Sequence, residues 1–166
     1  TAKACRAGIK AMGLELWAKT EAIASPTCTA VKVPAGVSDA DIIAAYTEDD
    51  VQRLLVNPGI IRNQAKIRAF IGNARAWNAL RAREDAVAWL WQFVDGRPQQ
   101  NVWASVADVP ASTPASDRMA RELKKLGFRF VGTTICYAFM QAVGMVNDHT
   151  TDCFRHADLA SGREIC

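Results

Sequence analysis

The stretch from Ser116 to Met145 constrains the fold most, because it predicts two helices joined by a very short turn. Apolar residues recur at helical spacing in its first half, at Met119, Leu123 and Leu126. Thr113 and Pro114 lie just upstream, and they supply an N-cap residue and a first-turn proline. Gly127 is expected to end the first helix, since a C-terminal cap with positive φ favours glycine.

The turn itself predicts an anion site. Gly132 closes it, and Thr133 or Thr134 can cap the second helix, in which three apolar residues share a face: Ile135, Phe139 and Val143. Helices joined by so short a turn pack closely. The backbone N–H groups of the turn and of the second helix start are therefore expected to point at solvent, where they can bind a phosphate.

The region before this hairpin is expected to differ between its two halves. A helix is predicted over 1–12, an extended segment over 14–17 and a β-strand over 27–33. A lone strand cannot satisfy its backbone, so it must pair with the 14–17 segment or with another subunit. From Ser38 onward we expect only helices. Two short ones begin at capping boxes, formed by Ser38 with Asp41 and by Thr47 with Asp50. A long helix is predicted over 61–80, where the apolar positions are Ile67, Ile71, Ala74 and Trp77, and another over 86–94.

Length and composition are those of an ordinary globular protein. The 166 residues suit a single domain with a real core, and 50% hydrophobic with 22% charged residues favours neither disorder nor a membrane span. Five cysteines, an odd number, with no visible signal peptide predict reduced thiols and a cytoplasmic location.

The net charge of +3 is small, so its distribution matters more than its total. Lys124, Lys125 and Arg129 flank the hairpin. Such a cluster is either a solvated helix face or a phosphate-binding surface, and the hairpin beside it favours the second interpretation.

The hairpin also carries a family resemblance. LKKLGFRFVGTTICYAFMQAVGMVNDH resembles the helix-hairpin-helix region of the 3-methyladenine DNA glycosylase I family, and the resemblance extends over about 44–153. It implies a mainly α fold, a helix-hairpin-helix bundle preceded by a short N-terminal helix-strand segment. It also implies that DNA phosphate is bound without sequence readout by Lys124, Lys125, Gly127, Arg129, Gly132, Thr133 and Thr134.

The first residues resemble a different family. GIKAMGLEL and SPTCTAVKVP are similar to the C-terminal domain of the alanine-glyoxylate and serine-pyruvate aminotransferases. We therefore predict two parts, 1–43 and 44–166, and a chimera that arose artificially or by recombination. Pyridoxal phosphate is not expected, because Lys10, Lys19 and Lys32 do not match the lysine that holds it in that family.

The resemblance implies a loss of function. In the glycosylase family the recognition glutamate, the base-holding aromatic residues and two zinc ligands lie in an N-terminal segment that nothing here matches. Glu15 beside Trp17 is better explained by the aminotransferase resemblance, so no catalytic residue is assigned. The main prediction is a truncated domain with at most residual, non-specific DNA binding. The alternative is an active DNA-3-methyladenine glycosylase, which hydrolyses the N-glycosyl bond of alkylated adenine.

Zinc and self-association are two further expectations. His149 and Cys153 match the family's two C-terminal zinc ligands, and their i, i+4 spacing could place both on one helical face. Two ligands rarely hold zinc, so a metal-free tail is predicted, and bound zinc is the alternative if others complete the set: His156, Cys166, Cys5 or Cys28. The 27–33 strand makes a homo-oligomer attractive, since pairing through the N-terminal segment would remove an open edge.

Overall fold

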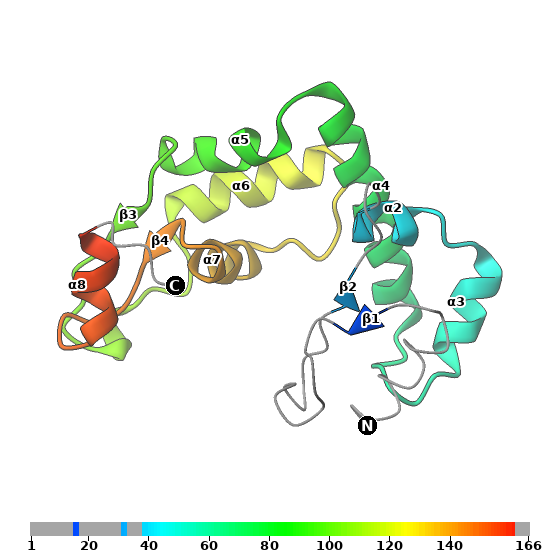
Figure 1. Ribbon diagram of the computed structural model, residues 1–166, viewed down its shortest axis with the longest axis horizontal. Helices are drawn as coiled ribbons and strands as arrows, with labels where there is room; N and C mark the ends of the chain where they lie inside the picture. The colour runs from blue at the N-terminus through cyan, green and yellow to red at the C-terminus, as the bar shows by residue number, and fades with distance from the viewer. Residues whose placement is uncertain (1–14, 17–30, 33–37, 162–166) are drawn as a thin grey trace. The chain divides into compact units, whose positions relative to one another are not determined.

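The computed structural model describes residues 15–16, 31–32 and 38–161, and the chain divides into two compact units, 1–78 and 79–166. The fold is mainly helical, as predicted (Figure 1). Unit 1 contains the strands β1 (Glu15–Leu16) and β2 (Val31–Lys32), the helices α2 (Asp39–Ala44) and α3 (Glu48–Leu55), and most of α4 (Gln64–Arg83), which continues into unit 2.

The two short helices of unit 1 begin where the capping boxes predict. At α2 the backbone N–H of Ser38 donates to the Asp41 carboxylate at 2.9 Å, and the N–H of Asp41 donates back to the Ser38 hydroxyl. At α3 the N–H of Thr47 donates to the Asp50 carboxylate at 2.9 Å. Helix α4 begins at Gln64 instead of near 61. The side-chain oxygen of Asn63 accepts from the backbone N–H of Lys66 at 3.0 Å, so Asn63 is the N-cap residue.

Unit 1 has a small apolar core between α3 and α4. It is formed by Val51, Ile67 and Ile71, which confirms the predicted inner face of the long helix. Arg75 on α4 ties this helix to the segment between α2 and α3, because its guanidinium donates to the carbonyl oxygens of Ala44 at 2.9 Å and Tyr46 at 3.0 Å.

The predicted strand finds its partner within the chain. β1 and β2 pair antiparallel, with Glu15 opposite Lys32 and Leu16 opposite Val31. Of the two partners predicted for the strand, the structure shows the 14–17 segment. The predicted helix over 1–12 lies outside the described residues.

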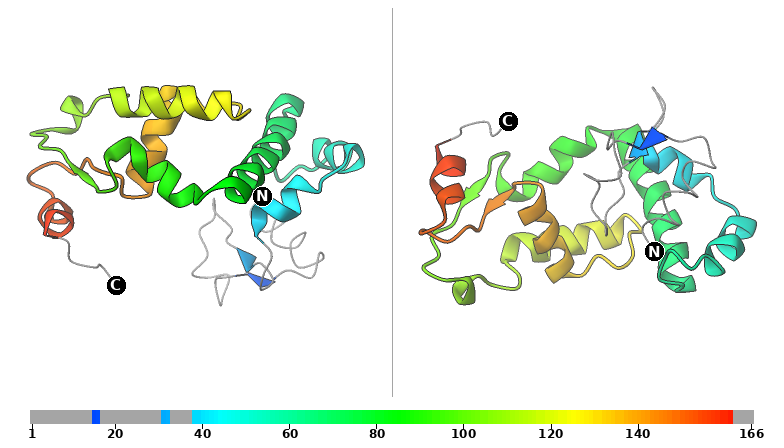
Figure 2. Two further views of the ribbon diagram at one scale, coloured as in Figure 1. Left: turned by 90° about the horizontal axis from the view of Figure 1, so that it is seen from above. Right: turned by 60° about the horizontal axis from the view of Figure 1, so that its bottom comes forward.

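Unit 2 is built around two crossing helices, α6 (Pro114–Lys125) and α7 (Thr133–Ala142), with α5 (Ala86–Trp91) and the 3-10 turn η1 (Gln92–Val94) beside α6 (Figure 2). It also contains β3 (Gln99–Gln100), the 3-10 turn η2 (Val106–Asp108), β4 (Val146–Asn147) and α8 (Phe154–Ala160). Its core is the buried set Phe93, Val94, Ala115, Met119, Ala120, Leu123, Cys136, Tyr137, Met140, Met145 and Val146.

The prediction that everything after Ser38 is helical is wrong at one place. β3 and β4 pair in parallel, with Gln99 opposite Val146 and Gln100 opposite Asn147. A parallel bridge between Trp103 and Thr150 continues this contact. Strands of two residues leave no periodic pattern in a sequence, and these pairs form only because the chain after α7 returns to the segment after η1.

The apolar face predicted for α7 is the exposed one. Ile135, Phe139 and Val143 are 60%, 39% and 46% exposed. The buried face carries Cys136, Tyr137 and Met140. Cys136 is thus a small buried residue of the core of unit 2. No helix among the described residues is long and apolar enough to cross a membrane.

Candidate functional site: the helix hairpin and the Asp148 cluster

A double hydrogen bond and a left-handed glycine end helix α6. Gly127 has φ of +92°, its N–H donates to the carbonyl of Lys124 at 3.0 Å, and the N–H of Phe128 donates to that of Leu123 at 3.0 Å. This is the Schellman arrangement, which satisfies carbonyls at a helix end and reverses the chain. The stop predicted at Gly127 is confirmed.

The turn between the helices holds one residue in an unusual conformation. Phe130 has φ of +57° and its side chain is 58% exposed. A bulky residue with positive φ is rare because its Cβ crowds the backbone. An aromatic ring is therefore held in solvent at this turn at a conformational cost, a feature that the sequence did not reveal.

The cap of α7 differs from the prediction. Gly132, with φ of −71°, is the N-cap, and Thr133 is already helical. The Thr133 hydroxyl points back to α6, where it donates to the Asp117 carboxylate and lies 3.0 Å from the hydroxyl oxygen of the fully buried Ser116. The Thr133 hydroxyl therefore joins the two helices and is already engaged within the protein.

The other residues predicted to bind phosphate lie on the surface of the hairpin. Lys124, Lys125, Arg129 and Thr134 are exposed. Lys125 forms an ion pair with Glu122 at 2.7 Å, so part of its charge is neutralised within the helix. The hairpin thus combines exposed cations with the start of a ten-residue helix, whose positive end favours anions.

A second polar centre forms at the other end of α7, around the Asp148 carboxylate. One carboxylate oxygen accepts from the Asn101 amide at 2.7 Å and from the Trp103 indole N–H at 2.8 Å. The other accepts from the Gln141 amide at 2.8 Å. Asp148, which follows β4, therefore connects α7 with the segment after β3.

These contacts shift two pKa values in opposite directions. Burial raises the pKa of Asp148, but the nearby Tyr137 hydroxyl and the hydrogen bonds from Trp103, Gln141 and Asn101 outweigh it and hold the pKa below its usual value. Burial, together with the neighbouring Asp148 carboxylate, raises the pKa of Tyr137 far above that of a free phenol. At neutral pH the site therefore contains a carboxylate and a neutral tyrosine.

Asn147 organises the segment just before Asp148. Its side chain is buried, and its amide donates to the Gln100 side chain at 2.8 Å and to the carbonyl of His156 at 3.2 Å. The backbone from β4 to α8 is therefore fixed on both sides. His149, the next residue but one, is placed by this framework.

A cavity of about 480 Å³ lies against the outer face of α7 within unit 2. Its walls are mostly apolar, and its polar groups are Gln141, Asp148 and His149. The apolar walls come from α7, the following turn, β4 and α8: Ala138, Ala142, Gly144, Val146 and Leu159. A volume of this size falls within the range of small-molecule sites in proteins.

His149 and Cys153 are brought together, although not on a helix. They lie in the turn before α8, and the His149 Nδ1 and Cys153 Sγ atoms are 3.5 Å apart. Two ligands of one tetrahedral zinc ion, one nitrogen and one thiolate sulfur, lie about 3.6 Å apart, so the spacing fits half of such a site.

The other half is not present in the part of the chain that the structure describes, where no group of three or more His, Cys, Asp and Glu could hold a metal ion. His156 is engaged elsewhere, because its Nε2 lies 2.9 Å from the carbonyl oxygen of Asn101. Cys5, Cys28 and Cys166 lie outside the described residues. The metal-free tail and its alternative, bound zinc, both stay predictions.

Comparison with known proteins identifies the family. The model of the methyladenine glycosylase family matches residues 36–156. The chain belongs to the methyladenine glycosylase family. Among curated relatives of this family, DNA-3-methyladenine glycosylase 1 of Escherichia coli (strain K12) is 50% identical over 112 residues, 67% of this chain and 60% of that protein. The chain thus spans about 60% of the length of the curated glycosylase relatives that it matches.

Solved methyladenine glycosylase structures agree with the fold. The crystal structure of a 3-methyladenine DNA glycosylase I is 58% identical, with a TM-score of 0.67, and the match covers 70% of this chain and 64% of that one. A solution structure of a 3-methyladenine DNA glycosylase I is 49% identical, with a TM-score of 0.64 over 69% of this chain and 62% of that one.

The aminotransferase resemblance rests on a short match. The pyridoxamine–pyruvate transaminase of Mesorhizobium japonicum is 62% identical over 39 residues, which is 24% of this chain and 10% of that protein.

The methyladenine glycosylase matches overturn the predicted chimera with at most residual DNA binding. Homologues at 50% and 58% identity over about two thirds of the chain are DNA-3-methyladenine glycosylases, and this favours the alternative, an active glycosylase. The prediction was wrong because it gave more weight to the unmatched recognition glutamate and aromatic residues than to the long stretch of this sequence that resembles the family.

Sequence reasoning missed the Asp148 cluster. Asn101 and Trp103 lie 47 and 45 positions from Asp148, and no local pattern connects them. The one available signal was the run Asn147-Asp148-His149, in which an acidic residue directly precedes a predicted metal ligand.

Proposed function

We propose that this protein is a DNA-3-methyladenine glycosylase, which hydrolyses the N-glycosyl bond of alkylated adenine in DNA. The observation that carries the proposal is the 50% identity to the Escherichia coli enzyme of that name over 112 residues. The family model matches residues 36–156, which include both helices of the hairpin, and this supports the proposed role of the hairpin.

We infer that α6, the turn and α7 form a helix-hairpin-helix motif that holds the DNA backbone. The amides at the start of α7 would donate to a phosphate, and Lys124 and Arg129 would add positive charge. Thr134 is the exposed hydroxyl available for such a contact, because that of Thr133 is engaged with α6. Contacts of this kind position the protein on DNA but do not read the sequence.

The proposed reaction needs only water as a second reactant. Alkylation of a purine ring nitrogen leaves the base with a positive charge and weakens its bond to the sugar. The C1′–N bond breaks, the base leaves with the bonding electrons, and water adds to C1′ and releases a proton. The protein's contribution would be to extrude the nucleotide and to hold the strand while this happens.

The direct test is to incubate the protein with DNA that has been treated with a methylating agent. We expect release of free 3-methyladenine, measured by liquid chromatography with mass spectrometry, above that from untreated DNA. No release at any enzyme concentration, with DNA binding intact, would contradict the proposed activity.

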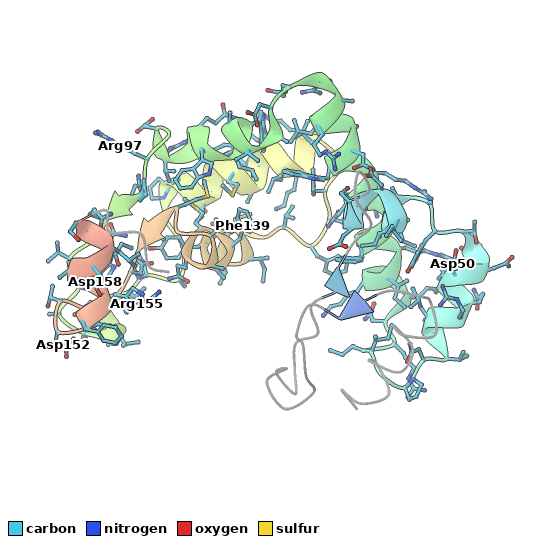
Figure 3. The ribbon with its side chains drawn as sticks, in the orientation of Figure 1. Asp50, Arg97, Phe139, Asp152, Arg155 and Asp158 are labelled. Atoms are coloured by element: carbon cyan, nitrogen blue, oxygen red, sulfur yellow. The ribbon has the colours of Figure 1, made fainter. Side chains whose placement is uncertain are left out.

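A matched pair of variants tests the role of the hairpin. R129A should weaken DNA binding and base release together, because it removes a cation at the turn. R97A removes an exposed arginine from the turn between η1 and β3 of unit 2, and it should change neither (Figure 3). Equal effects of both substitutions would mean that only the net charge matters.

Self-association through the N-terminal segment is a separate proposal. The pairing of β1 with β2 already gives that strand a partner within the chain. Light scattering after size-exclusion chromatography would decide it, and a monomer at all concentrations would remove it.

A further inference from the structure

Phe130, in the turn between α6 and α7, is a bulky residue that the fold holds in a left-handed conformation. Among the residues that the structure describes, two that are not glycine have positive φ, Asp95 at +54° and Phe130 at +57°. Aspartate tolerates this region because its short polar side chain can bond locally, whereas the Cβ of phenylalanine crowds the backbone. A glycine would adopt the same conformation without that cost. The shape of the turn therefore does not explain why this position carries an aromatic ring.

The residues around Phe130 explain how its conformation is maintained. Phe128 and Val131 are partly buried and pack against the core of unit 2. The backbone is thus anchored on both sides of Phe130, and such anchoring is what allows a strained residue to persist. The Phe130 ring itself is 58% exposed. The turn buries the apolar side chains on either side and directs this ring to solvent.

The ring adjoins the cations of the proposed phosphate site. Arg129 is the preceding residue and is exposed, as is Lys124 in the last turn of α6. Thr134 is exposed in the first turn of α7. An apolar ring beside positive charges and helix-start amides complements a nucleic acid strand, in which phosphates alternate with the apolar faces of sugars. This charge complementarity favours DNA over another protein as the partner of the ring.

The ring is also close enough to act on the same strand as the phosphate site. Phe130 precedes Thr133, the first residue of α7, by three positions, which span at most about 11 Å. A DNA strand advances about 3.4 Å along its axis for each nucleotide. The ring therefore lies within about three nucleotides of a phosphate held at the start of α7.

We propose that the Phe130 ring is an apolar contact for DNA, and that it packs against a deoxyribose of the strand whose phosphate the hairpin holds. This inference rests on the proposed function of the hairpin. In an intact duplex the bases are stacked inside, whereas the C–H groups of the sugars lie beside the phosphates. The contact reads no sequence and carries no charge. Phe130 thus adds a part of the affinity that salt does not weaken to the salt-dependent part from Lys124 and Arg129.

The experiment measures binding of the full chain to an undamaged, fluorescein-labelled DNA duplex by fluorescence anisotropy at several salt concentrations. An undamaged duplex keeps binding separate from base release. We expect F130A to weaken binding about tenfold, the effect of removing one buried face of an aromatic ring. The slope of log affinity against log salt concentration should stay unchanged in F130A, because an apolar contact releases no counterions. R129A should decrease that slope.

Three further variants separate the ring from the fold and from general hydrophobicity. F130G removes the ring and adopts positive φ freely, so DNA affinity should fall as in F130A while the midpoint of thermal unfolding does not fall. F130Y keeps the ring and should keep the affinity. F70A is the matched control: Phe70 lies on α4 in unit 1 and is 63% exposed, and its removal should leave DNA affinity unchanged.

The outcomes separate this inference from the proposed function. Unchanged affinity in F130A, with weaker binding in R129A, would overturn the ring contact and leave the hairpin site standing. An equal loss in F70A would overturn it as well, and so would a loss in F130A that decreases the salt slope, because the ring would then act through the shape of the turn. Binding that depends on the Phe130 ring, without release of 3-methyladenine from methylated DNA, would support the contact and reject only the glycosylase activity.

Discussion

Gly127 is the residue on which the geometry of the hairpin depends most directly. Its φ of +92° places it in the left-handed region, and a Cβ added there would meet no other atom within 4 Å. G127A therefore changes the backbone energy alone, without a steric clash. The left-handed conformation costs an alanine about 1–2 kcal/mol. Stiffening of the unfolded chain by the same substitution offsets roughly 0.4–1 kcal/mol of this cost, because it reduces the conformational entropy that folding removes.

The expected net effect of G127A is a loss of about 1 kcal/mol in the stability of unit 2. Hydrogen–deuterium exchange, followed by mass spectrometry, can assign this loss to one unit. Amides of α6 and α7 that exchange through global opening of unit 2 should lose about fivefold in protection, since 1.4 kcal/mol corresponds to a factor of ten. Peptides from α3 in unit 1 serve as an internal reference.

Gly72 provides a control of opposite sign. It lies inside helix α4, and a Cβ there would also meet no atom within 4 Å. G72A should therefore stabilise unit 1 by about 0.5–1 kcal/mol, the usual gain in a helix interior. If G127A proves neutral or stabilising while G72A behaves as expected, the assigned role of the left-handed glycine in ending α6 is refuted.

Three further outcomes follow from the contacts described above. T133V should destabilise unit 2 by about 1–2 kcal/mol in urea unfolding, because a hydrogen bond to a carboxylate is lost, whereas T134V at an exposed position should change it by less than about 0.5 kcal/mol. The depressed pKa of Asp148 should stabilise the fold above the pKa of an unfolded aspartate, about 3.9, and this contribution should fade as the pH falls through the lower folded value. The stability difference from D148N should then shrink at acid pH, and a difference that stays constant from pH 7 to pH 3 would contradict that reasoning. The slope of log affinity for DNA against log salt concentration should decrease by about one for R129A and equally for K124A; unchanged slopes would mean that neither side chain contacts phosphate.

The features that could be predicted from sequence are those that neighbouring residues determine. The capping boxes at Ser38 and Thr47 and the glycine stop at Gly127 depend on side chains within three or four positions of each other. Helix α7 shows where such patterns become insufficient. It has apolar residues on both faces, so periodicity finds the stripes but cannot decide which one packs against α6.

The candidate site was only partly within reach for a related reason. The cations beside the short turn can be found in the sequence, and Lys124, Lys125 and Arg129 are exposed there in the structure. The engagement of Thr133 with Asp117 depends on how two helices cross, and the Asp148 cluster depends on a parallel contact between segments far apart in the chain. Neither crossing nor contact leaves a local pattern.

The buried core of unit 2 has a consequence for how this protein can change over time. Among the residues that the structure describes, every member of that core lies between Phe93 and Val146. The partly buried residues that pack against it begin at Trp89, so substitutions ahead of Trp89 leave the side chains of this core and of the residues packed against it unchanged. The amino-terminal sequence can therefore change during evolution without replacing any side chain of this core.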